Sequence, residues 1–171
     1  MTSTDTSGKT TTGRLVGKVA LITGAGSVGP GWGNGRATAV RFAEEGARVF
    51  GVDCDEARMQ ETAQRIADAG GTFVSGSCDV TSSTSIAAMV ARCIAEFGRI
   101  DVLINNVGGS AKGGPVEMSE EVWDAQIDHN LKSVFLMCKH VLPYMLAQGG
   151  GAIVNLSSTS GTRWTGAAQI A

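Results

Sequence analysis

The sequence predicts a doubly wound α/β domain, in which helices cover both faces of one parallel sheet. Short apolar segments of strand length alternate with longer segments of helical periodicity from residue 15 onward. The strand-like segments are apolar at successive positions, as is typical of strands buried on both faces. A glycine-rich turn joins the first strand-like segment to the first helix-like segment. This order favours parallel strands joined by right-handed helical crossovers.

The strand-like segments are short, and most of them are rich in apolar residues. They cover residues 18–23, 48–53, 72–78, 100–105 and 152–156. The third is the weakest, because Ser and Gly interrupt it. No period of 20–50 residues repeats along the chain, so the pattern indicates one domain and not a solenoid.

Helical periodicity predicts helices at residues 36–45, 55–69, 82–97 and 119–148, and a glycine follows each of them. Glycine is common just after the end of a helix. Ser119 can cap the last helix, and the acidic residues Glu120 and Glu121 suit its first turn. Pro143 is expected to bend or break this helix, because proline lacks the N–H that a helix interior needs.

Length and charge exclude several classes of protein. The 171 residues suit a single domain. Residues 1–14 are rich in Thr and Ser and are expected to be a flexible tail before a domain at 15–171. The net charge of −2 argues against nucleic-acid binding. No apolar run approaches the ~20 residues of a membrane span, and the start of the chain lacks the pattern of a signal peptide.

The four cysteines, Cys54, Cys78, Cys93 and Cys138, lack the CxxC spacing of a zinc or redox site. They are expected to be buried free thiols, which suits a protein of the reducing cytoplasm. No metal site is expected.

The glycine-rich turn at residues 23–35 is the first candidate site. Glycines let a backbone turn tightly and approach a pyrophosphate, which then meets the free N–H groups at the start of the helix. The strand before the turn and the helix after it support this interpretation. The candidate phosphate-binding residues are Gly24, Ser27, Gly33, Asn34 and Gly35. The alternative is a flexible loop without a ligand.

Asp53 ends the second strand-like segment and is the second candidate. A carboxylate at this place accepts hydrogen bonds from a ribose diol and repels a 2′-phosphate. Cys54, and not an arginine, follows it, and no basic residue interrupts the glycine turn. Both points favour NAD over NADP. The alternative is that Asp53 is an acidic loop residue or a cap for the segment that begins at Asp55.

Polar residues also follow the other three strands. Asp79 and Val80 follow the third strand, Asn105 to Gly108 follow the fourth, and Ser158 follows the fifth. Asp79 alone is also compatible with a simple turn. The side-chain amides of Asn105 and Asn106 can either brace a neighbouring strand or contact a ligand. All five strand ends share the carboxyl edge of a parallel sheet, where ligands bind in such folds.

These motifs together resemble the classical short-chain dehydrogenase/reductase family. The resemblance covers about residues 15–171 and includes the stretches that begin at Asn105, Asn130 and Ile153. It implies a Rossmann-type fold and an oxidoreductase that transfers a hydride between NAD(P) and an alcohol or carbonyl substrate. It also implies a homo-oligomer, either a dimer or a tetramer.

The resemblance also implies roles for single residues. Gly24, Gly33 and Gly35 would hold the pyrophosphate, and Asp53 the adenosine ribose. Asp79 and Val80 would contact adenine, while Asn105, Asn106 and Gly108 would line the cofactor cleft. Ser158 would bind the substrate oxygen, and Asn130 would hold a water of the proton relay.

The sequence departs from the family pattern in the glycine turn and after Ser158. Residues 28–32 are inserted in the turn, Asn34 replaces an apolar residue, and Val107 replaces alanine. The family's Tyr-x-x-x-Lys motif, its general acid/base, is expected about a dozen residues beyond Ser158. Tyr144 is followed four residues later by Gln148 and is expected to be a packing residue.

The 171 residues are therefore expected to be an incomplete copy of a longer enzyme, with five of the seven usual strands and slow activity at best. The last strand is expected to lie at an uncovered edge. Apolar positions of the last helix are also expected to be uncovered, namely Val134, Phe135, Met137, Cys138, Val141 and Leu142.

Two other functions remain open. The chain can be a non-catalytic dinucleotide-binding module, or a Rossmann enzyme of another class, such as a methyltransferase. The amides at Asn105 and Asn106 and the serine pair before Thr159 argue against the methyltransferase. NADH binding is expected to quench the emission of Trp32, whereas S-adenosylmethionine is not. His129 and His140 are expected to be surface or packing residues.

Overall fold

Five parallel strands form the central sheet of the computed structural model, which describes residues 2–4 and 10–163. Their order across the sheet is β5-β4-β3-β6-β7, and every neighbouring pair is parallel. The strands are β3 (Val19–Thr23), β4 (Arg48–Asp53), β5 (Thr72–Ser77), β6 (Val102–Asn105) and β7 (Ala152–Asn155). This order confirms the predicted doubly wound sheet.

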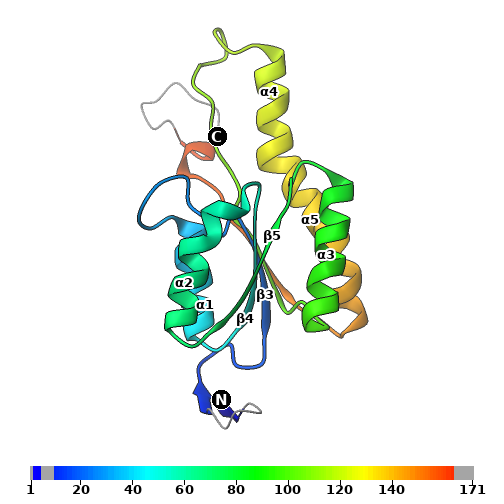
Figure 1. Ribbon diagram of the computed structural model, residues 1–171. Helices are drawn as coiled ribbons and strands as arrows, with labels where there is room; N and C mark the ends of the chain where they lie inside the picture. Colours follow the sequence, from blue (N-terminus) through cyan, green and yellow to red (C-terminus); the bar gives the residue numbers. More distant parts are fainter. Residues whose placement is uncertain (1, 5–9, 164–171) are drawn as a thin grey trace.

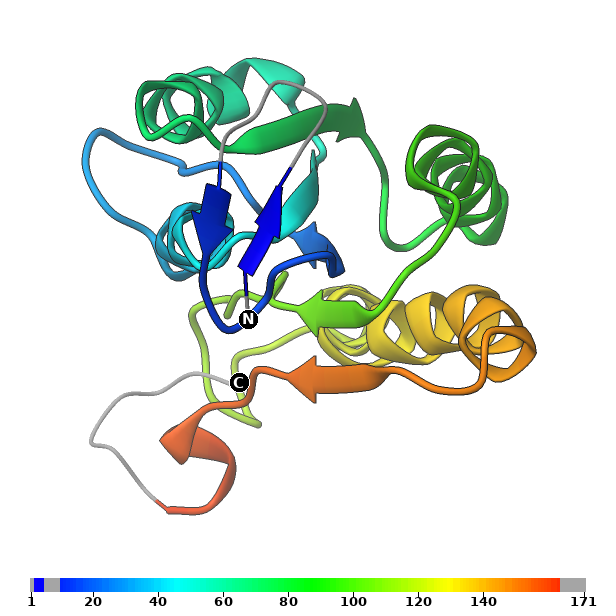
Figure 2. The same ribbon diagram turned by 90° about the horizontal axis from the view of Figure 1, so that it is seen from below.

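Helices cover both faces of this sheet (Figure 1). On one face lie α1 (Asn34–Glu44) and α2 (Gln60–Asp68), which a 3-10 turn η1 (Glu56–Met59) precedes. On the other face lie α3 (Ser83–Phe97) and α5 (Ser133–Ala147), and Figure 2 shows the same two layers from below. The chain moves outward from β3 to β5 and then returns to β6 on the other side of β3. The order of strands therefore reverses between β3 and β6. In folds of this type, the ligand-binding crevice lies at the carboxyl edge beside such a reversal.

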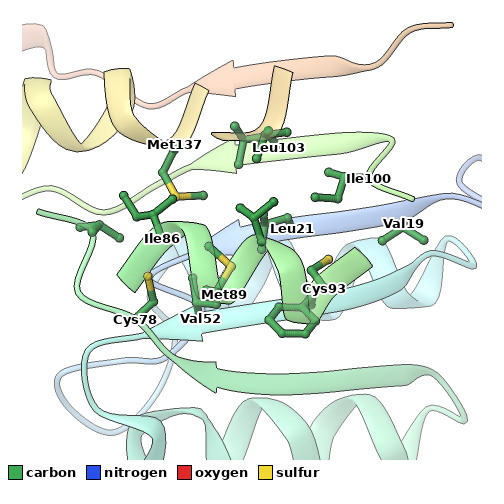
Figure 3. Packing of buried hydrophobic residues seen from close by; sticks show 14 of the residues in the cluster. Val19, Leu21, Val52, Cys78, Ile86, Met89, Cys93, Ile100, Leu103 and Met137 are labelled. Carbon is green, nitrogen blue, oxygen red and sulfur yellow. The ribbon is translucent and has the colours of Figure 1, made fainter. Parts of the chain in front are cut away.

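The continuous apolar sequence of β3 reflects its two buried faces. Val19 and Leu21 pack into the core beneath α3 and α5, whereas Ala20 and Ile22 pack into the core beneath α1 and α2. Figure 3 shows the first of these cores, with Met89 of α3 close to Leu21. A strand whose successive side chains enter different cores needs an apolar residue at every position.

The last helical region differs from the single helix expected over 119–148. It comprises α4 (Glu120–Ile127), a π-helical turn η2 (Asp128–Lys132) and α5. Ser119 caps α4 as predicted, since its Oγ accepts a hydrogen bond from the Val122 N–H at 3.4 Å. Of the predicted bend or break at Pro143, the break does not occur, because Pro143 lies inside α5. Both Pro143 and Lys139, whose carbonyl loses its helical partner, are exposed, so water can hydrate that carbonyl.

Six apolar side chains of α5 were predicted to be uncovered, and the prediction is correct only for those that point away from α3. Phe135 and Leu142 are 61% and 41% exposed, as expected. Met137 and Val141 are buried at 1% and 0%, because they face the core that α5 shares with α3. Tyr144, expected to be a packing residue, is exposed.

Val134 and Cys138 of α5 are half-buried, so neither is as open as expected. The strand β7 lies at the edge of the sheet as predicted, and Val154 on it is 49% exposed.

The start of the chain has more structure than the expected tail. Thr2–Thr4 (β1) and Thr10–Thr12 (β2) pair as an antiparallel ribbon, separate from the main sheet. Arg14 is tied to the end of α1, since its backbone N–H and its guanidinium both donate to the Glu45 carboxylate, at 2.9 and 3.1 Å. These bonds hold the pKa of Glu45 at about 2.

The cysteines are all free, but their burial differs. Cys78 and Cys93 are buried as predicted, and burial raises the pKa of Cys93 to about 12. Cys138 is half-buried, and Cys54 is exposed, which corrects the expectation for that residue. Cys54 is exposed because it follows the end of β4 at the open edge of the sheet.

Within residues 2–4 and 10–163, no helix has the length and apolar character that crossing a membrane requires. Across the same residues, no group of three or more His, Cys, Asp or Glu side chains is arranged to hold a metal ion.

Asp101 fastens the amino edge of the sheet. Its Oδ2 accepts from the Val19 N–H and from Arg99 Nε, both at 2.9 Å, and its Oδ1 accepts from Arg99 Nη2 at 2.6 Å. Burial alone would raise the pKa of Asp101, but these hydrogen bonds and the charges of Arg99 and Lys18 outweigh it and lower the pKa. The ionised carboxylate therefore stabilises the folded chain at neutral pH.

Truncation of Leu103 should destabilise the fold strongly. Leu103 is fully buried in the core beneath α3 and α5, so Leu103→Ala should lower the free energy of unfolding by about 2–5 kcal/mol. Leu146→Ala removes the same atoms from a side chain that is 76% exposed, and should cost less than about 0.5 kcal/mol. Urea unfolding followed by circular dichroism measures both. Equal losses in the two variants would contradict the assigned core.

The stability that Asp101 contributes should depend on pH. Since its folded pKa is lowered, this contribution is present above the unfolded pKa of about 3.9 and is lost as the pH falls through the folded value. Asp101→Asn should therefore cost about 1–3 kcal/mol at pH 7. The difference from wild type should shrink below about pH 4 in urea titrations. A difference that stays constant down to pH 3 would show that the charge is not its source.

Candidate functional site

The candidate site lies at the carboxyl edge of the sheet, around the crevice between β3 and β6. The loops after β3, β4, β5, β6 and β7 all leave the sheet at this edge, because the strands are parallel. The sequence therefore placed its candidate residues on one edge correctly.

Close backbone packing joins β3 to the start of α1. A Cβ on Gly35 would lie 1.8 Å from the Gly24 carbonyl oxygen and 2.6 Å from Asn106 Nδ2. Gly24 itself has φ +63°, a conformation that side chains disfavour. Both glycines are therefore needed to bring the first turn of the helix against the strand.

Thr23 and Asn106 hold this junction to the loop after β6. The Asn106 and Val107 N–H groups donate to Thr23 Oγ1 at 2.9 and 3.2 Å, and that hydroxyl donates to the Ile104 carbonyl at 3.3 Å. Asn106 Nδ2 in turn donates to the carbonyls of Thr23 and Gly24, at 3.0 and 3.1 Å. Asn106 thus joins the loop after β6 to the end of β3. The sequence analysis included Thr23 in the glycine-rich turn but assigned it no role, although a hydroxyl at the end of a buried apolar strand is a usable signal.

The N-terminus of α1 opens at this crevice. Gly33 is its cap residue, and no side chain caps the helix. The nearest atom to a Cβ on Gly33 would be Ser27 Oγ at 3.6 Å, and Asn34 is exposed. Ser27 uses its hydroxyl hydrogen within the loop, on the Gly29 carbonyl at 2.8 Å. The helix therefore presents backbone N–H groups that can bind an anion.

The inserted segment, residues 28–32, is fastened to α2. Arg36, whose side chain is 3% exposed, donates to the Gly31 carbonyl and to Glu61 Oε2, the latter at 2.6 Å. Arg65 also holds Glu61, at 2.7 Å, and its guanidinium stacks on the Trp32 ring at 4.5 Å. The pairs Arg36–Glu61 and Arg65–Trp32 were not visible in the sequence, because their partners are more than twenty residues apart.

Asp53 faces the glycine turn from the end of β4. Its side chain is 11% exposed, and its Oδ2 accepts from the Gly26 N–H at 3.3 Å. Arg58, which the sequence prediction missed, places Nη1 3.7 Å from Asp53 Oδ1. Capping of η1 belongs instead to Asp55, which accepts from the Ala57 N–H at 3.0 Å. Asp53 is therefore not the N-cap of η1, although its Oδ1 accepts from the Asp55 N–H at 3.3 Å, as the alternative of an acidic loop residue allows.

Asp79 and Val80 differ in what they present at the edge. Asp79 is exposed, and hydrogen bonds from the Thr81 hydroxyl and N–H, with the nearby His129, lower its pKa. Ser85 fixes its backbone by accepting from the Asp79 N–H at 3.0 Å. Val80 is 7% exposed and packs in the core, so its side chain serves mainly the fold.

Asn105 braces the neighbouring strand. It is 3% exposed, and its Nδ2 donates to Asn155 Oδ1 at 2.8 Å, across the register of β6 and β7. Within the described part of the chain, Asn105 Oδ1 has no hydrogen-bond partner. Of the two roles considered for this amide, the structure shows the bracing one.

Asn130 ties the loop after β6 to the π-helical turn η2. Its Oδ1 accepts from the Gly109 N–H at 2.9 Å, and its Nδ2 donates to the carbonyls of Gly109 and Gln126 at 2.8 and 3.0 Å. A Cβ on Gly108 would lie 3.2 Å from the same Oδ1. Such π-helical turns occur frequently at functional sites.

Ser158 lies beyond β7, on an exposed segment. Its Oγ accepts from the Ser160 N–H at 3.1 Å and caps the 3-10 turn η3 (Thr159–Gly161). As the acceptor in this bond, the hydroxyl keeps its hydrogen for another partner. The histidines follow the expectation: His129 is half-buried, and His140 Nε2 contacts Ser83 Oγ at 2.9 Å, which links α5 to α3.

A parallel sheet in this order, with a glycine turn at its first strand, defines a Rossmann-type domain. The sequence profile of the short chain dehydrogenase family matches residues 18–169, and the chain belongs to this family. This finding confirms the resemblance drawn from the motifs.

Two curated relatives each share about two fifths of their aligned residues with the chain. It is 40% identical over 149 residues to the D-threitol dehydrogenase of Mycolicibacterium smegmatis, covering 87% of this chain and 55% of that protein. It is 41% identical over 148 residues to a 3-oxoacyl-acyl-carrier-protein reductase of Thermotoga maritima, covering 86% and 58%. The chain thus spans little more than half the length of these curated relatives.

Crystal structures of short-chain dehydrogenases have the same fold as the chain. A crystal structure described as a short-chain dehydrogenase/reductase from Burkholderia xenovorans superposes with a TM-score of 0.90 at 60% identity, covering 92% of this chain and 62% of that one. A short chain dehydrogenase from Mycobacterium smegmatis gives a TM-score of 0.84 at 37% identity, covering 92% and 65%.

Substitution of Gly35 should disrupt the junction that forms the site. The added Cβ of Gly35→Ala meets backbone at 1.8 Å, so α1 must move, at a cost of about 1–3 kcal/mol or more. Gly29→Ala is the matched control, because nothing lies within 4 Å of its Cβ. Thermal unfolding compares the two variants. A Gly35 variant as stable as the Gly29 variant would contradict the close packing.

Proposed function

We propose that the chain forms the cofactor-binding part of an oxidoreductase that transfers a hydride between a nicotinamide cofactor and an alcohol or carbonyl substrate. Membership of the short chain dehydrogenase family supports this reaction class. The two named relatives carry dehydrogenase and reductase names, consistent with either direction of the reaction.

One observation carries the proposal. At the reversal point of the sheet, an uncapped helix N-terminus and a carboxylate flank the same glycine turn. The helix end suits a diphosphate, and Asp53 suits the two hydroxyls of a ribose. A Cβ on Gly33 would make only ordinary contacts, with Ser27 and Gly26 at 3.6–3.9 Å. The residues present thus fit a dinucleotide.

NAD is the preferred cofactor in this proposal. Asp53 accepts hydrogen bonds from a free 2′-hydroxyl and repels a phosphate at the same place. The turn from Gly24 to Gly35 contributes no basic side chain.

Catalytic roles are proposed for Ser158 and Asn130. The nicotinamide, when bound, supplies or accepts the hydride. The exposed Ser158 hydroxyl would donate a hydrogen bond to the substrate oxygen and so orient the reacting carbon. Asn130 would hold a water of the proton relay. Its position supports this role, because its amide is hydrogen-bonded to Gly109 in the loop after β6.

The assembly and the compartment are also proposals. Exposed apolar side chains along η2 and α5, such as Leu131, Phe135 and Leu146, support a homo-oligomer of the whole protein. Four free cysteines support a cytoplasmic location.

Removal of the Asp53 carboxylate should weaken NADH binding. Asp53→Ala should raise the Kd for NADH about tenfold or more, because it removes charge-assisted hydrogen bonds to the ribose. Asp68→Ala, on exposed surface at the end of α2, should leave the Kd unchanged. Titration followed by nicotinamide fluorescence measures both values, with S-adenosylmethionine as the competing ligand that should have no effect.

Failure of the folded wild-type chain to bind NADH, or displacement of NADH by S-adenosylmethionine, would overturn the proposed function. Equal binding by wild type and Asp53→Ala would overturn the role of Asp53 alone.

A further inference from the structure

We infer that Arg65 is a positioning residue for the glycine turn: by holding the ring of Trp32, it orders the inserted segment in advance and so raises the affinity for the cofactor. The inference rests on the proposed function, because it concerns how firmly the same anion-binding turn is held. Arg65 belongs to α2 and lies outside the turn, so its effect on binding would pass through Trp32.

The composition of the glycine turn makes its order costly. Residues 23–35 include six glycines, and two of them, Gly29 and Gly31, lie in the inserted segment 28–32. Glycine loses more conformational freedom on ordering than any other residue, and a longer loop costs more to close. Val28 is 91% exposed, and a Cβ on Gly29 or Gly31 would have nothing within 4 Å. Neighbouring side chains therefore give the middle of the segment little support.

Two contacts hold the end of the segment that leads into α1. Arg36 donates a hydrogen bond to the Gly31 carbonyl. The Arg65 guanidinium lies 4.5 Å from the centroid of the Trp32 ring, a distance at which a cation and an aromatic face attract each other. Trp32 directly precedes Gly33, the cap residue of α1. The two contacts therefore fix the backbone immediately before the N–H groups that would bind the diphosphate.

One carboxylate supports both contacts. Glu61 Oε2 accepts from Arg36 at 2.6 Å, and Glu61 Oε1 accepts from Nε and Nη2 of Arg65 at 3.0 and 2.7 Å. The hydrogen bond from Arg65 and the charge of Arg36 lower the pKa of Glu61, so this carboxylate is ionised at neutral pH. A planar guanidinium that is bound along one edge keeps its face in one orientation. Glu61 therefore directs that face of Arg65 toward the Trp32 ring.

Arg36 has a wider structural role than Arg65. Its side chain is 3% exposed, and it also donates to Thr62 Oγ1 at 3.2 Å, which in turn donates to the Ala25 carbonyl at 2.8 Å. Removal of Arg36 would leave buried groups without partners. The side chain of Arg65 is 40% exposed, and Trp32 is 60% exposed. Both can therefore be shortened without opening the core, which separates their effect on binding from an effect on folding.

The consequence for affinity follows from when the turn is ordered. A loop that is disordered in the free protein must be ordered by the ligand, and this free-energy cost lowers the affinity. The contacts of Arg65 with Glu61 and Trp32 form without any ligand. The N–H groups at the start of α1 are then already in place when a diphosphate arrives.

The test is a double-mutant cycle on the Kd for NADH, measured by nicotinamide fluorescence with Arg65→Ala, Trp32→Ala and the double variant. Arg65→Ala should raise the Kd about two- to fivefold, which matches the usual strength of an exposed cation–π contact. The double variant should have the same Kd as Trp32→Ala, because the contact between the two side chains can be lost only once. Trp32→Phe keeps an aromatic face and should stay within about twofold of wild type.

Arg41→Ala is the matched control, because Arg41 is 60% exposed on α1 and pairs with Glu44 and Glu45. It should leave the Kd unchanged, and thermal unfolding should show that each variant is folded. ADP and adenosine, used as competitors of NADH, locate the effect within the ligand. Arg65→Ala should weaken ADP by the same factor as NADH and leave adenosine, which has no phosphate, unchanged.

Losses that multiply in the double variant would overturn the inference, because Arg65 would then act by its own charge and not through Trp32. Equal weakening of ADP and adenosine would also overturn it, since it would indicate a general structural role. An Arg65→Ala variant that binds NADH as wild type does would overturn the inference and leave the proposed function standing. A folded wild-type chain that does not bind NADH would overturn both.

Discussion

The contact between Gly35 and the carbonyl of Gly24 determines how the rest of the site is built. It brings the first turn of α1 so close to the end of β3 that a Cβ has no room. Hydrogen bonds from Asn106 to the carbonyls of Thr23 and Gly24 add the loop after β6 to the same junction. The position of the helix N-terminus and the placement of the loop after β6 therefore follow from one backbone approach.

The inserted segment, residues 28–32, leaves this junction undisturbed. Its interactions are with Arg36, which also binds Glu61 of α2, and with Arg65 of α2. Arg36 leaves the first turn of α1 and binds the Gly31 carbonyl and Glu61. A buried arginine is costly without partners, so the chain needs Glu61 and Thr62 at this point of α2. Glu61 in turn orients Arg65 beneath the Trp32 ring. The longer loop is thus held toward α2.

The features that could be predicted from the sequence are those that depend on neighbouring residues, such as apolar runs and turn glycines. The alternation of β3 between two cores requires a continuous apolar run, so its boundaries were visible, and turn glycines marked the helix ends. The π-helical turn at Asn130 was not visible, because it accompanies hydrogen bonds to Gly109, twenty-one residues away. Arg36 was missed for the same reason, because its partners Glu61 and Thr62 are 25 and 26 residues away. The burial of Met137 was misjudged because the packing of α5 against α3 depends on topology and not on periodicity.

The two halves of the site differ in how firmly the described residues hold them. The half that would hold adenosine in the proposed function rests on the central strands β3 and β4, with Asp53 and Asn106 fixed by backbone bonds. Ser158 follows the edge strand β7, which the amide pair Asn105–Asn155 joins to β6. In the proposed function, cofactor affinity would therefore depend on interactions deep in the sheet, whereas the placement of Ser158 depends on one strand at its margin. Substitutions in β7 should consequently disturb the geometry at Ser158 before they disturb the ribose site, because Asp53 and β7 lie on opposite sides of β3.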